Sequence, residues 1–296
     1  MTGNPAAISL RHLLLALAVV GIWGTNFVVV KLGLAHLPPL LLAALRFSLA
    51  LMPAMFFVPR PTASIRNLAL YGLLIGVGQI GLLYVAMNGH ISPGIASLVV
   101  QMQVFFTIAL SMRLNGERLR PIQWLALLLA GIGLLIILLH TGGMATGLGL
   151  LLVLIAALSW AGGNMTARQS GATNMLAYVV WSSTFAIPPL FALSFAIDGW
   201  EVDLAALRQA GAATWTAVAW QAWGNSLFGF AAWGWLLARN PATTVMPIAL
   251  LIPVFGIGAS ALWLGESLPA WELLAAALIV AALAVNLIRP SPVVNA

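Results

Sequence analysis

The side chains best able to do chemistry in this sequence are uncharged polar groups that interrupt long apolar stretches. Trp23, Thr25 and Asn26 lie close to the middle of the first such stretch. A polar group is costly in hydrocarbon unless it is satisfied, so groups at this depth usually face a bundle interior or a watery cavity. The amide of Asn26 can donate to a carboxylate and accept from an ammonium group, which suits a zwitterionic ligand. The alternative is packing, in which Asn26 bonds a neighbouring helix and Gly24 allows close approach.

A second group of polar residues lies near the middle of another apolar stretch. Gln101 and Gln103 are separated by roughly 200 degrees around a helix, so both can hardly face one cavity. Thr107 follows Gln103 by one turn on the same face, which favours Gln103 as the cavity residue and Gln101 as a helix contact. Gln79 and Tyr84 are similar candidates in the preceding stretch.

The second half of the chain offers candidates around Trp160 and Asn164. Between them, Gly162 and Gly163 weaken the helix and permit either a bend toward a ligand or tight packing. Pro253, with Pro247 before it, frees backbone carbonyls and predicts a broken or kinked helix of the sort that transporters use at binding sites. Kinks without function are also common in membrane helices.

Aromatic side chains are concentrated between residues 213 and 237. Trp220 and Trp223 lie deepest, and they form either a wall for a substrate or bulk that faces lipid. Asn225 in the same stretch and Trp181 in the preceding one add further candidates. The predicted substrate-binding or pathway residues are therefore Trp23, Asn26, Gln79, Tyr84, Gln103, Thr107, Trp160, Asn164, Trp181, Trp220, Asn225 and Pro253.

Charged side chains are almost absent from the apolar stretches. Arg46 is the one basic residue well inside a stretch, and we expect it to pair, to cap carbonyls or to extend toward the interface, which are structural roles. No Asp or Glu lies at the centre of a stretch. This argues against the common buried-carboxylate proton relay and favours facilitated export or coupling through another group.

The sequence does not support an enzyme. Its four histidines lie at the ends of apolar stretches, and no acidic or nucleophilic group accompanies them at catalytic spacing. It has no cysteine, which excludes thiol catalysis and cysteine metal sites. We therefore expect no catalytic residues, no metal and no organic cofactor. A structural or sensory membrane subunit is a third class, but it would leave the polar residues without a shared cavity.

Composition identifies an integral membrane protein. Hydrophobic residues make up 62% of the chain and charged residues 6%, whereas roughly a quarter of a soluble protein is charged. The mean hydropathy is +1.06. A net charge of +6 comes from twelve basic residues spread thinly over 296, so no dense basic patch exists for nucleic acid. The lipid bilayer is the expected partner.

Hydropathy divides the chain into ten predicted membrane-spanning helices. They cover residues 13–34, 40–58, 68–87, 92–114, 121–139, 147–167, 175–196, 213–237, 243–264 and 269–288. Cytoplasmic loops carry an excess of Lys and Arg, and nine arginines fall on the side of both termini while Lys31 and Arg208 fall on the other. Both termini are therefore predicted to be cytoplasmic, and the longest loop, residues 198–212, to lie outside.

The two halves of the sequence resemble each other. Residues 93–119 and 241–268 are each an apolar stretch that ends in Gly-Glu-x-Leu, and a shift of 149 places puts Phe106 on Phe255 and Glu117 on Glu266. We infer two repeats, residues 1–143 and 144–296, of five helices each. Because five is odd, the repeats must insert with opposite orientation, as in many secondary transporters.

Several segments resemble a known family. They are WGTNFVVVKLGLAHLPPLLLAALRF at 23–47, QMQVFFTI at 101–108, GERL at 116–119 and SWAGGNM at 159–165. The chain resembles the EamA family of the drug/metabolite transporter superfamily, and within it the bacterial cysteine and O-acetylserine exporters. This resemblance implies an all-α, ten-helix carrier of the bacterial inner membrane that exports amino acids and related metabolites by alternating access. Export of drugs or bulky aromatic metabolites is the alternative, and a monomer is expected.

Overall fold

The fold is known from a computed structural model that describes residues 8–52, 54–115, 121–140, 145–240 and 242–287. Throughout these ranges the chain is helical and contains no β-strand beyond one isolated bridge between Ile91 and Ala145. Part of the repeated motif, Gly116, Glu117 and Leu119, lies outside the described residues. So do three arginines used to assign orientation, Arg118, Arg120 and Arg289.

The first half folds into helices whose bounds follow the predicted stretches closely. They are α1 (Leu10–Leu34), α2 (Pro39–Leu51), η1 (Ala54–Phe56), α3 (Ile65–Gly72), η2 (Leu73–Gly81), α4 (Leu82–Met87), α5 (Pro93–Val99), α6 (Met102–Asn115) and α7 (Pro121–His140).

The second half repeats this organisation with one addition, α10, in the stretch expected to be a loop. Its elements are α8 (Gly147–Gln169), α9 (Met175–Ile197), α10 (Trp200–Gln209), α11 (Ala212–Ala219), η3 (Trp220–Phe230), α12 (Ala231–Arg239), α13 (Ala242–Val245), η4 (Met246–Leu251), α14 (Ile252–Leu264) and α15 (Ala270–Leu287). The α10 helix forms because Ala206 and Leu207 on one of its faces pack against the core.

Six helical segments of the described chain are long and apolar enough to cross a bilayer. They are Leu10–Leu34, Pro39–Phe56, Ile65–Met87, Pro93–Leu114, Gly147–Gln169 and Met175–Ile197. Shorter apolar helices cover Trp124–Gly133, Ile248–Leu264 and Ala270–Ala282.

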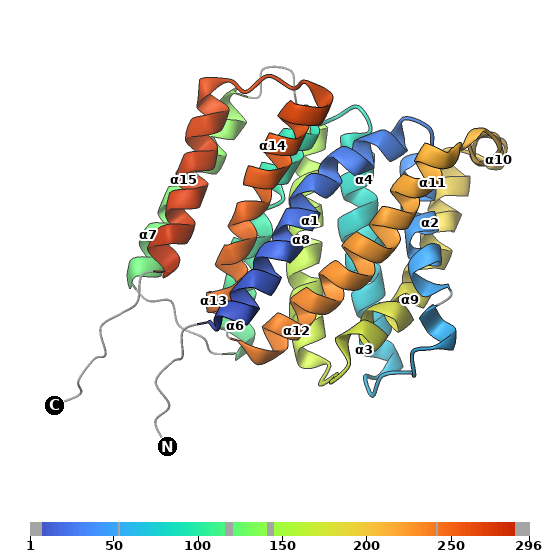
Figure 1. The fold of residues 1–296 in the computed structure, drawn as a ribbon, viewed down its shortest axis with the longest axis horizontal. Helices are drawn as coiled ribbons and strands as arrows, with labels where there is room; N and C mark the ends of the chain where they lie inside the picture. Colours follow the sequence, from blue (N-terminus) through green and yellow to red (C-terminus); the bar gives the residue numbers. More distant parts are fainter. Residues whose placement is uncertain (1–7, 53, 116–120, 141–144, 241, 288–296) are drawn as a thin grey trace.

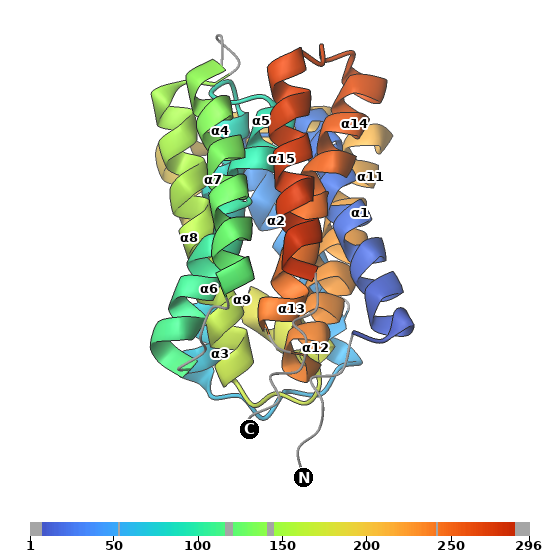
Figure 2. The ribbon, with the colours of Figure 1, turned by 90° about the vertical axis from the view of Figure 1, so that its left-hand side faces the viewer.

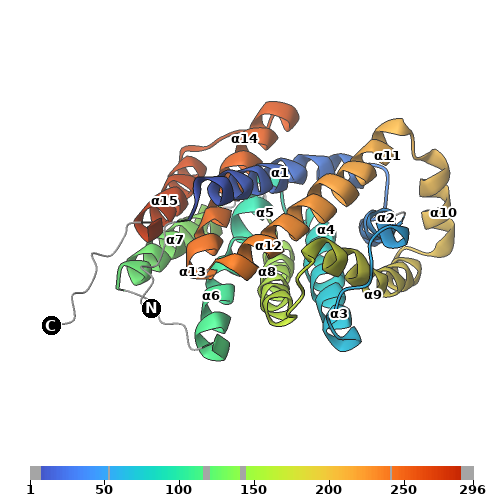
Figure 3. The ribbon, with the colours of Figure 1, turned by 60° about the horizontal axis from the view of Figure 1, so that its bottom comes forward.

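The helices form a bundle in which each half packs mainly against the other. The most extensive contacts join α1 to α14, α2 to α9, α6 to α8, and α7 to α15. In Figure 3, α1, α14 and α11 lie along one face and α3, α6 and α8 along the opposite face, with α4 and α5 between them. The α7 and α15 pair lies at one side of the bundle in Figure 1 and runs side by side in Figure 2.

Two unusually long π-helical stretches interrupt the bundle. These stretches are η2, with 9 residues, and η3, with 11. The π-helix is rare and is frequently found at functional sites, where its wider turns displace side chains from the α-helical positions. The shift of 149 places that aligns the sequence repeat puts η2 within η3. The two halves therefore depart from α-helical geometry at equivalent places.

The expected irregularity at the two late prolines is present. The segment before α14 is the 3₁₀ helix η4, and Pro253 occupies the first turn of α14. A proline is tolerated in a first turn because the backbone N–H that it lacks would have no helical partner there. The α14 helix ends at Gly265, whose φ of 66° and ψ of 24° lie in the left-handed region. The Gly of the repeated Gly-Glu motif thus serves turn geometry.

The closest approach between α1 and α14 depends on Gly24. A Cβ atom placed there would lie 2.5 Å from the Cβ of Phe255 and 2.6 Å from the carbonyl oxygen of Ile252. On the same face one turn earlier, a Cβ on Gly21 would meet nothing nearer than 3.7 Å. The expectation that Gly24 permits close helix packing is therefore confirmed.

Replacement of Gly24 by Ala is expected to destabilise the protein by about 1–3 kcal/mol, because overpacking forces the two backbones apart. The matched change Gly21→Ala should leave stability unchanged or raise it, because Ala is the better helix former. Thermal unfolding of both purified variants in detergent measures the difference. Equal unfolding temperatures would contradict the role given to this contact.

Candidate functional site

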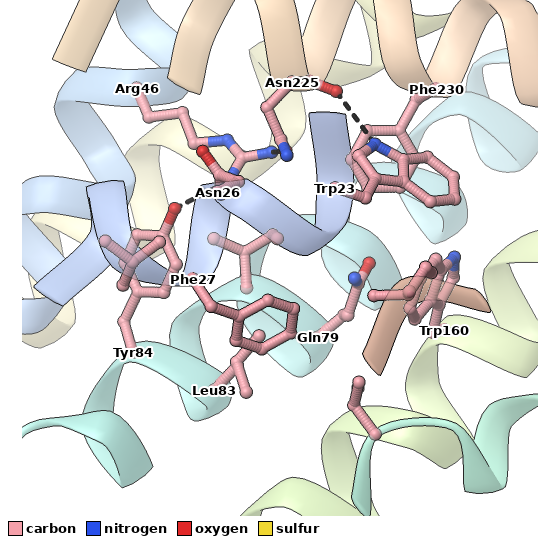
Figure 4. Close-up of a pocket in the computed structure, with 14 residues that line it drawn as sticks. Trp23, Asn26, Phe27, Arg46, Gln79, Leu83, Tyr84, Trp160, Asn225 and Phe230 are labelled. Carbon is pink, nitrogen blue, oxygen red and sulfur yellow. Dashed lines mark hydrogen bonds between the residues drawn. The ribbon is translucent and has the colours of Figure 1, made fainter. Parts of the chain in front are cut away.

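A small cavity with a mostly apolar lining and a few polar groups lies between the two halves of the bundle. Its volume is about 40 Å³. At roughly 10–15 Å³ for each water-sized sphere, it has room for about three water molecules. The lining comes from seven elements of the two halves, and Figure 4 shows these side chains pointing toward a shared space. The lining residues are Trp23, Asn26, Phe27, Val30, Arg46, Gln79, Ile80, Leu83, Tyr84, Val100, Trp160, Asn225, Phe230 and Ile252.

The centre of the site is the fully buried guanidinium of Arg46 on α2. Its Nε–H donates to Ser226 Oγ at 2.7 Å, and one terminal nitrogen donates to Tyr84 Oη at 2.6 Å. The other terminal nitrogen donates to Asn225 Oδ1. The hydroxyl of Tyr84 donates in turn to Gln221 Oε1. One cation thus connects α2 to α4 in its own half and to η3 in the other.

Three polar atoms of cavity-lining residues are buried without a hydrogen-bond partner. They are the acceptors Asn26 Oδ1 and Gln79 Oε1 and the donor Trp160 Nε1. A buried polar atom without a partner costs about 1–3 kcal/mol. Other described residues also have buried polar atoms without a partner, but these three share one cavity, where ordered water or a ligand has room to complete them.

Aromatic rings form one wall of the cavity. The indole of Trp23 lies 5.2 Å from that of Trp160 and 5.1 Å from the ring of Phe230, between centroids. Its Nε1–H donates to the carbonyl oxygen of Asn225 at 3.2 Å. A Cβ on Gly229 would overlap the Trp23 ring, so the absence of a side chain there lets the indole lie against η3. The wall is rigid because its members pack from three helices.

The structure brings six of the twelve predicted site residues to this cavity. They are Trp23, Asn26, Gln79, Tyr84, Trp160 and Asn225. They come from five separate elements, and what they share in the sequence is a polar or aromatic side chain at mid-depth of an apolar stretch.

Three other predicted residues form a separate buried cluster. The Nδ2 of Asn164 on α8 donates to Gln103 Oε1 and to Thr107 Oγ1 on α6, both at 3.3 Å. Gln103 and Thr107 do share a face, as predicted, but that face contacts α8 and does not line the cavity. Gln101 donates to the carbonyl oxygen of Ala249, which confirms its role as a helix contact.

The last three predicted residues also lie outside the cavity lining. Trp181 donates its Nε1–H to the carbonyl oxygen of Val58 at 3.1 Å. Trp220 is 41% exposed, which agrees with the alternative that this side chain faces lipid. Pro253 is buried in the first turn of α14, beside the cavity residue Ile252. A pathway role for these three stays a prediction.

Arg46 is the site residue that sequence reasoning assigned to structure alone. Its position toward one end of a stretch suggested an interfacial side chain, yet it is fully buried and lines the cavity. The available signal was its isolation, because it is the one basic residue well inside an apolar stretch. Among the described residues, no group of three or more His, Cys, Asp or Glu could hold a metal ion.

Comparison with known proteins identifies the family. The model of the EamA-like transporter family matches residues 10–139 and, a second time, residues 147–288. The chain belongs to the EamA-like transporter family. Together with the six long apolar segments, this membership makes the chain a multi-pass membrane protein and a transporter rather than an enzyme.

Some relatives of this chain match it over almost its whole length and others over about half of it. A probable amino-acid metabolite efflux pump of Escherichia coli K12 is 39% identical over 92% of this chain and 93% of its own. An uncharacterized inner membrane transporter of the same strain is 33% identical over 53% of this chain and 55% of its own. One crystal structure matches with a TM-score of 0.69 at 21% identity, over 93% of this chain and 97% of that chain. That likeness shows the fold alone.

The Tyr84 hydroxyl should stabilise the EamA-like bundle, because it accepts from Arg46 and donates to Gln221. Tyr84→Phe leaves both partners buried with a bond unmade, which costs about 1–3 kcal/mol. Tyr71 is a matched control, since it is also buried in the third apolar segment but no hydrogen bond of its hydroxyl is seen among the described residues. The unfolding temperature in detergent should therefore be clearly lower for Tyr84→Phe than for Tyr71→Phe. The reverse order would refute the hydrogen-bond network of Arg46, Tyr84 and Gln221.

Proposed function

We propose that this protein is a secondary transporter of the bacterial inner membrane that exports amino acids and related small metabolites by alternating access. The observation that carries the proposal is the small cavity between the two halves, with a buried cation and unpartnered acceptors and donor around it. Such a site offers complementary groups to a small molecule with both a carboxylate and an ammonium. The relative in Escherichia coli named as a probable amino-acid metabolite efflux pump supports the same substrate class.

We infer that the architecture consists of ten membrane-spanning helices in two inverted repeats, residues 1–143 and 144–296. The two separate matches to one family model support this division. The helix contacts support it too. If α1 corresponds to α8 and α6 to α14, exchanging these counterparts turns the contact of α1 with α14 into the contact of α8 with α6, and both contacts are present. The same exchange turns the contact of α1 with η3 into that of α8 with η2. The α2 and α9 helices are counterparts of each other, as are α7 and α15, so the exchange leaves these two contacts unchanged.

Inversion of the repeats gives the transporter its mechanism. Each repeat can adopt the conformation of the other, and the two resulting arrangements of the bundle would open the same cavity to opposite sides of the membrane. The first turn of α1 and the last turn of α15 lie at the same end of the bundle (Figure 1), which supports an even number of spans. The excess of arginine supports a cytoplasmic location for that end under the positive-inside rule.

The cavity favours small substrates over bulky aromatic ones. A drug-sized ligand occupies a pocket of about 300–1,000 Å³, far above the 40 Å³ of this cavity, which must widen even for an amino acid and much more for a bulky aromatic compound. Of the tryptophans considered as possible substrate contacts, Trp23 and Trp160 line the cavity, whereas Trp220 and Trp223 are 41% and 50% exposed. Much of the aromatic content thus faces outward, where lipid is the natural partner.

We propose a monomeric carrier, because both halves of the same chain contribute to the lining of the cavity. None of those residues is Asp or Glu. We therefore propose export without a cofactor and without a carboxylate proton relay in the cavity. Facilitated export or coupling through another group fits this lining.

Counterflow in proteoliposomes tests the proposed function. Vesicles loaded with unlabelled amino acid should accumulate labelled cysteine or threonine with saturable kinetics and no imposed ion gradient, whereas labelled tryptophan should enter slowly. Empty vesicles provide the background. If accumulation occurs only after a proton gradient is imposed, uncoupled export is wrong; if no amino acid is exchanged, the proposed substrate class is wrong.

Asn26→Ala should lower counterflow by about tenfold, because one lost hydrogen bond to a charged group is worth about 1.5–3 kcal/mol. Gln101→Ala is the matched control, since Gln101 is equally buried but bonds Ala249 away from the cavity. Initial rates should be compared at equal amounts of folded protein. Equal losses in the two variants would mean that the cavity face of α1 does not contact the substrate.

A further inference from the structure

We propose that Arg46 is the counter-charge for the substrate's carboxylate, so that the carrier selects molecules bearing both a carboxylate and an amino group. This inference rests on the proposed function, which it deepens by naming the group that decides the substrate class. Four features of the described residues support it. Arg46 is buried, no described acidic side chain lies beside it, its guanidinium has N–H groups that make no bond, and unpartnered amide oxygens line the same cavity.

The charge of Arg46 is buried without an anion. The side chain is fully buried, and its three hydrogen-bond partners, Ser226, Tyr84 and Asn225, are all neutral. The chain has six acidic residues, and none of them is among those that line the cavity. The guanidinium stays protonated in proteins, so it cannot escape the cost of burial by losing its proton. An isolated buried charge costs several kcal/mol unless an opposite charge joins it.

Hydrogen-bond accounting leaves donors for a ligand. A guanidinium has five N–H donors in a planar fork. The structure uses three of them, one on each nitrogen, so each terminal nitrogen keeps one N–H. A carboxylate can accept from both terminal nitrogens in the bidentate arrangement, in which charge-assisted bonds are about twice as strong as neutral ones. Because Arg46 lines the cavity, a ligand there is within reach of these donors.

The acceptors that would receive an ammonium group line the same cavity. Asn26 Oδ1 and Gln79 Oε1 are buried and unpartnered. An ammonium group offers three donors, which is enough for both amides and one water. Figure 4 shows Asn26 beside Arg46 and Gln79 further along the cavity. A zwitterion whose carboxylate meets Arg46 supplies the missing anion and brings its ammonium group to the acceptor of Asn26 beside it, while Gln79 offers an acceptor further along the cavity to water or to the rest of the ligand.

A purely structural role for Arg46 would affect stability but would not make substrate recognition depend on a carboxylate. Its bonds join α2 to α4 and η3, so replacing it lowers stability under either role. Only the ligand role makes recognition depend on the carboxylate of the substrate. The test therefore compares substrates that differ in that group alone.

The experiment uses the purified full-length chain in proteoliposomes and in detergent. Labelled cysteine is exchanged in competition with unlabelled cysteine, cysteine amide or cysteamine, and each ligand is also tested for its effect on the unfolding temperature. We expect the two compounds without a carboxylate to compete at least about tenfold more weakly than cysteine, because charge-assisted bonds to the guanidinium are lost. Cysteine alone should raise the unfolding temperature.

Variants make the assignment specific to Arg46. Arg46→Gln should lose at least about tenfold in cysteine counterflow and should no longer prefer cysteine over cysteine amide. Arg46→Lys keeps the charge and should recover part of the cysteine counterflow and part of the preference for cysteine over its amide. Arg208→Gln is the matched control, because Arg208 lies exposed on α10 and its loss should change neither. If Arg46→Gln does not fold, Arg46→Lys decides: it keeps the charge without the planar fork, so it should bind cysteine more weakly than the unaltered protein while still preferring cysteine to its amide. Unchanged cysteine binding in folded Arg46→Lys overturns the role of the guanidinium.

The outcomes separate the inference from the proposed function. Equal competition by cysteine and cysteine amide, with saturable amino-acid exchange intact, overturns the role of Arg46 and leaves the exporter standing. Retained preference for cysteine in folded Arg46→Gln overturns it as well. If no ligand binds and no amino acid is exchanged, the proposed function itself is overturned.

Discussion

A positive charge held inside a helical bundle constrains everything around it. Water no longer solvates the guanidinium of Arg46, so the protein must surround it with oxygen atoms, and those of Ser226, Tyr84 and Asn225 come from helices in both halves. Two of these residues lie on η3, where π-helical turns change which side chains face inward. The position of α2 relative to η3 therefore depends on solvating one ion. Ordinary apolar packing, which has no direction, supplies the rest of the bundle.

The proposed inverted repeats would let such a site serve two sides of a membrane, and the pattern of helix contacts supports them. The strongest helix pairs cross between the halves, so neither half has a complete core alone. The residues that line the cavity are not symmetric, since ten come from the first half and four from the second. A nearly symmetric frame with an asymmetric lining lets the frame move while a single binding chemistry is kept. The divergence of the two halves is then where specificity resides.

Much of the fold followed from the sequence because its evidence is local. Apolar runs bounded by Pro, Gly or polar residues predicted the helices within a few residues, and mid-depth polar side chains such as Asn26 and Gln79 predicted part of the cavity. The π-helices had no comparable signal, because tertiary packing selects their wider turns and residue spacing does not. Gln103 shows the limit of facing arguments: its face was predicted correctly, but the neighbour on that face was Asn164. Arg46 has hydrogen-bond partners, as expected, but its full burial was not expected, because depth was counted along α2 alone while Tyr84 and η3 enclose it from elsewhere in the chain.

The small volume of the cavity also bears on how the membrane keeps its voltage. A space for about three water molecules is too short for a continuous file of water across about 30 Å of hydrocarbon. Protons hop along such files, and a fixed arginine raises the electrostatic barrier to any cation that approaches. This cavity by itself therefore gives protons no continuous path through the bundle, so a site built on a buried charge need not leak the ion gradients of the cell.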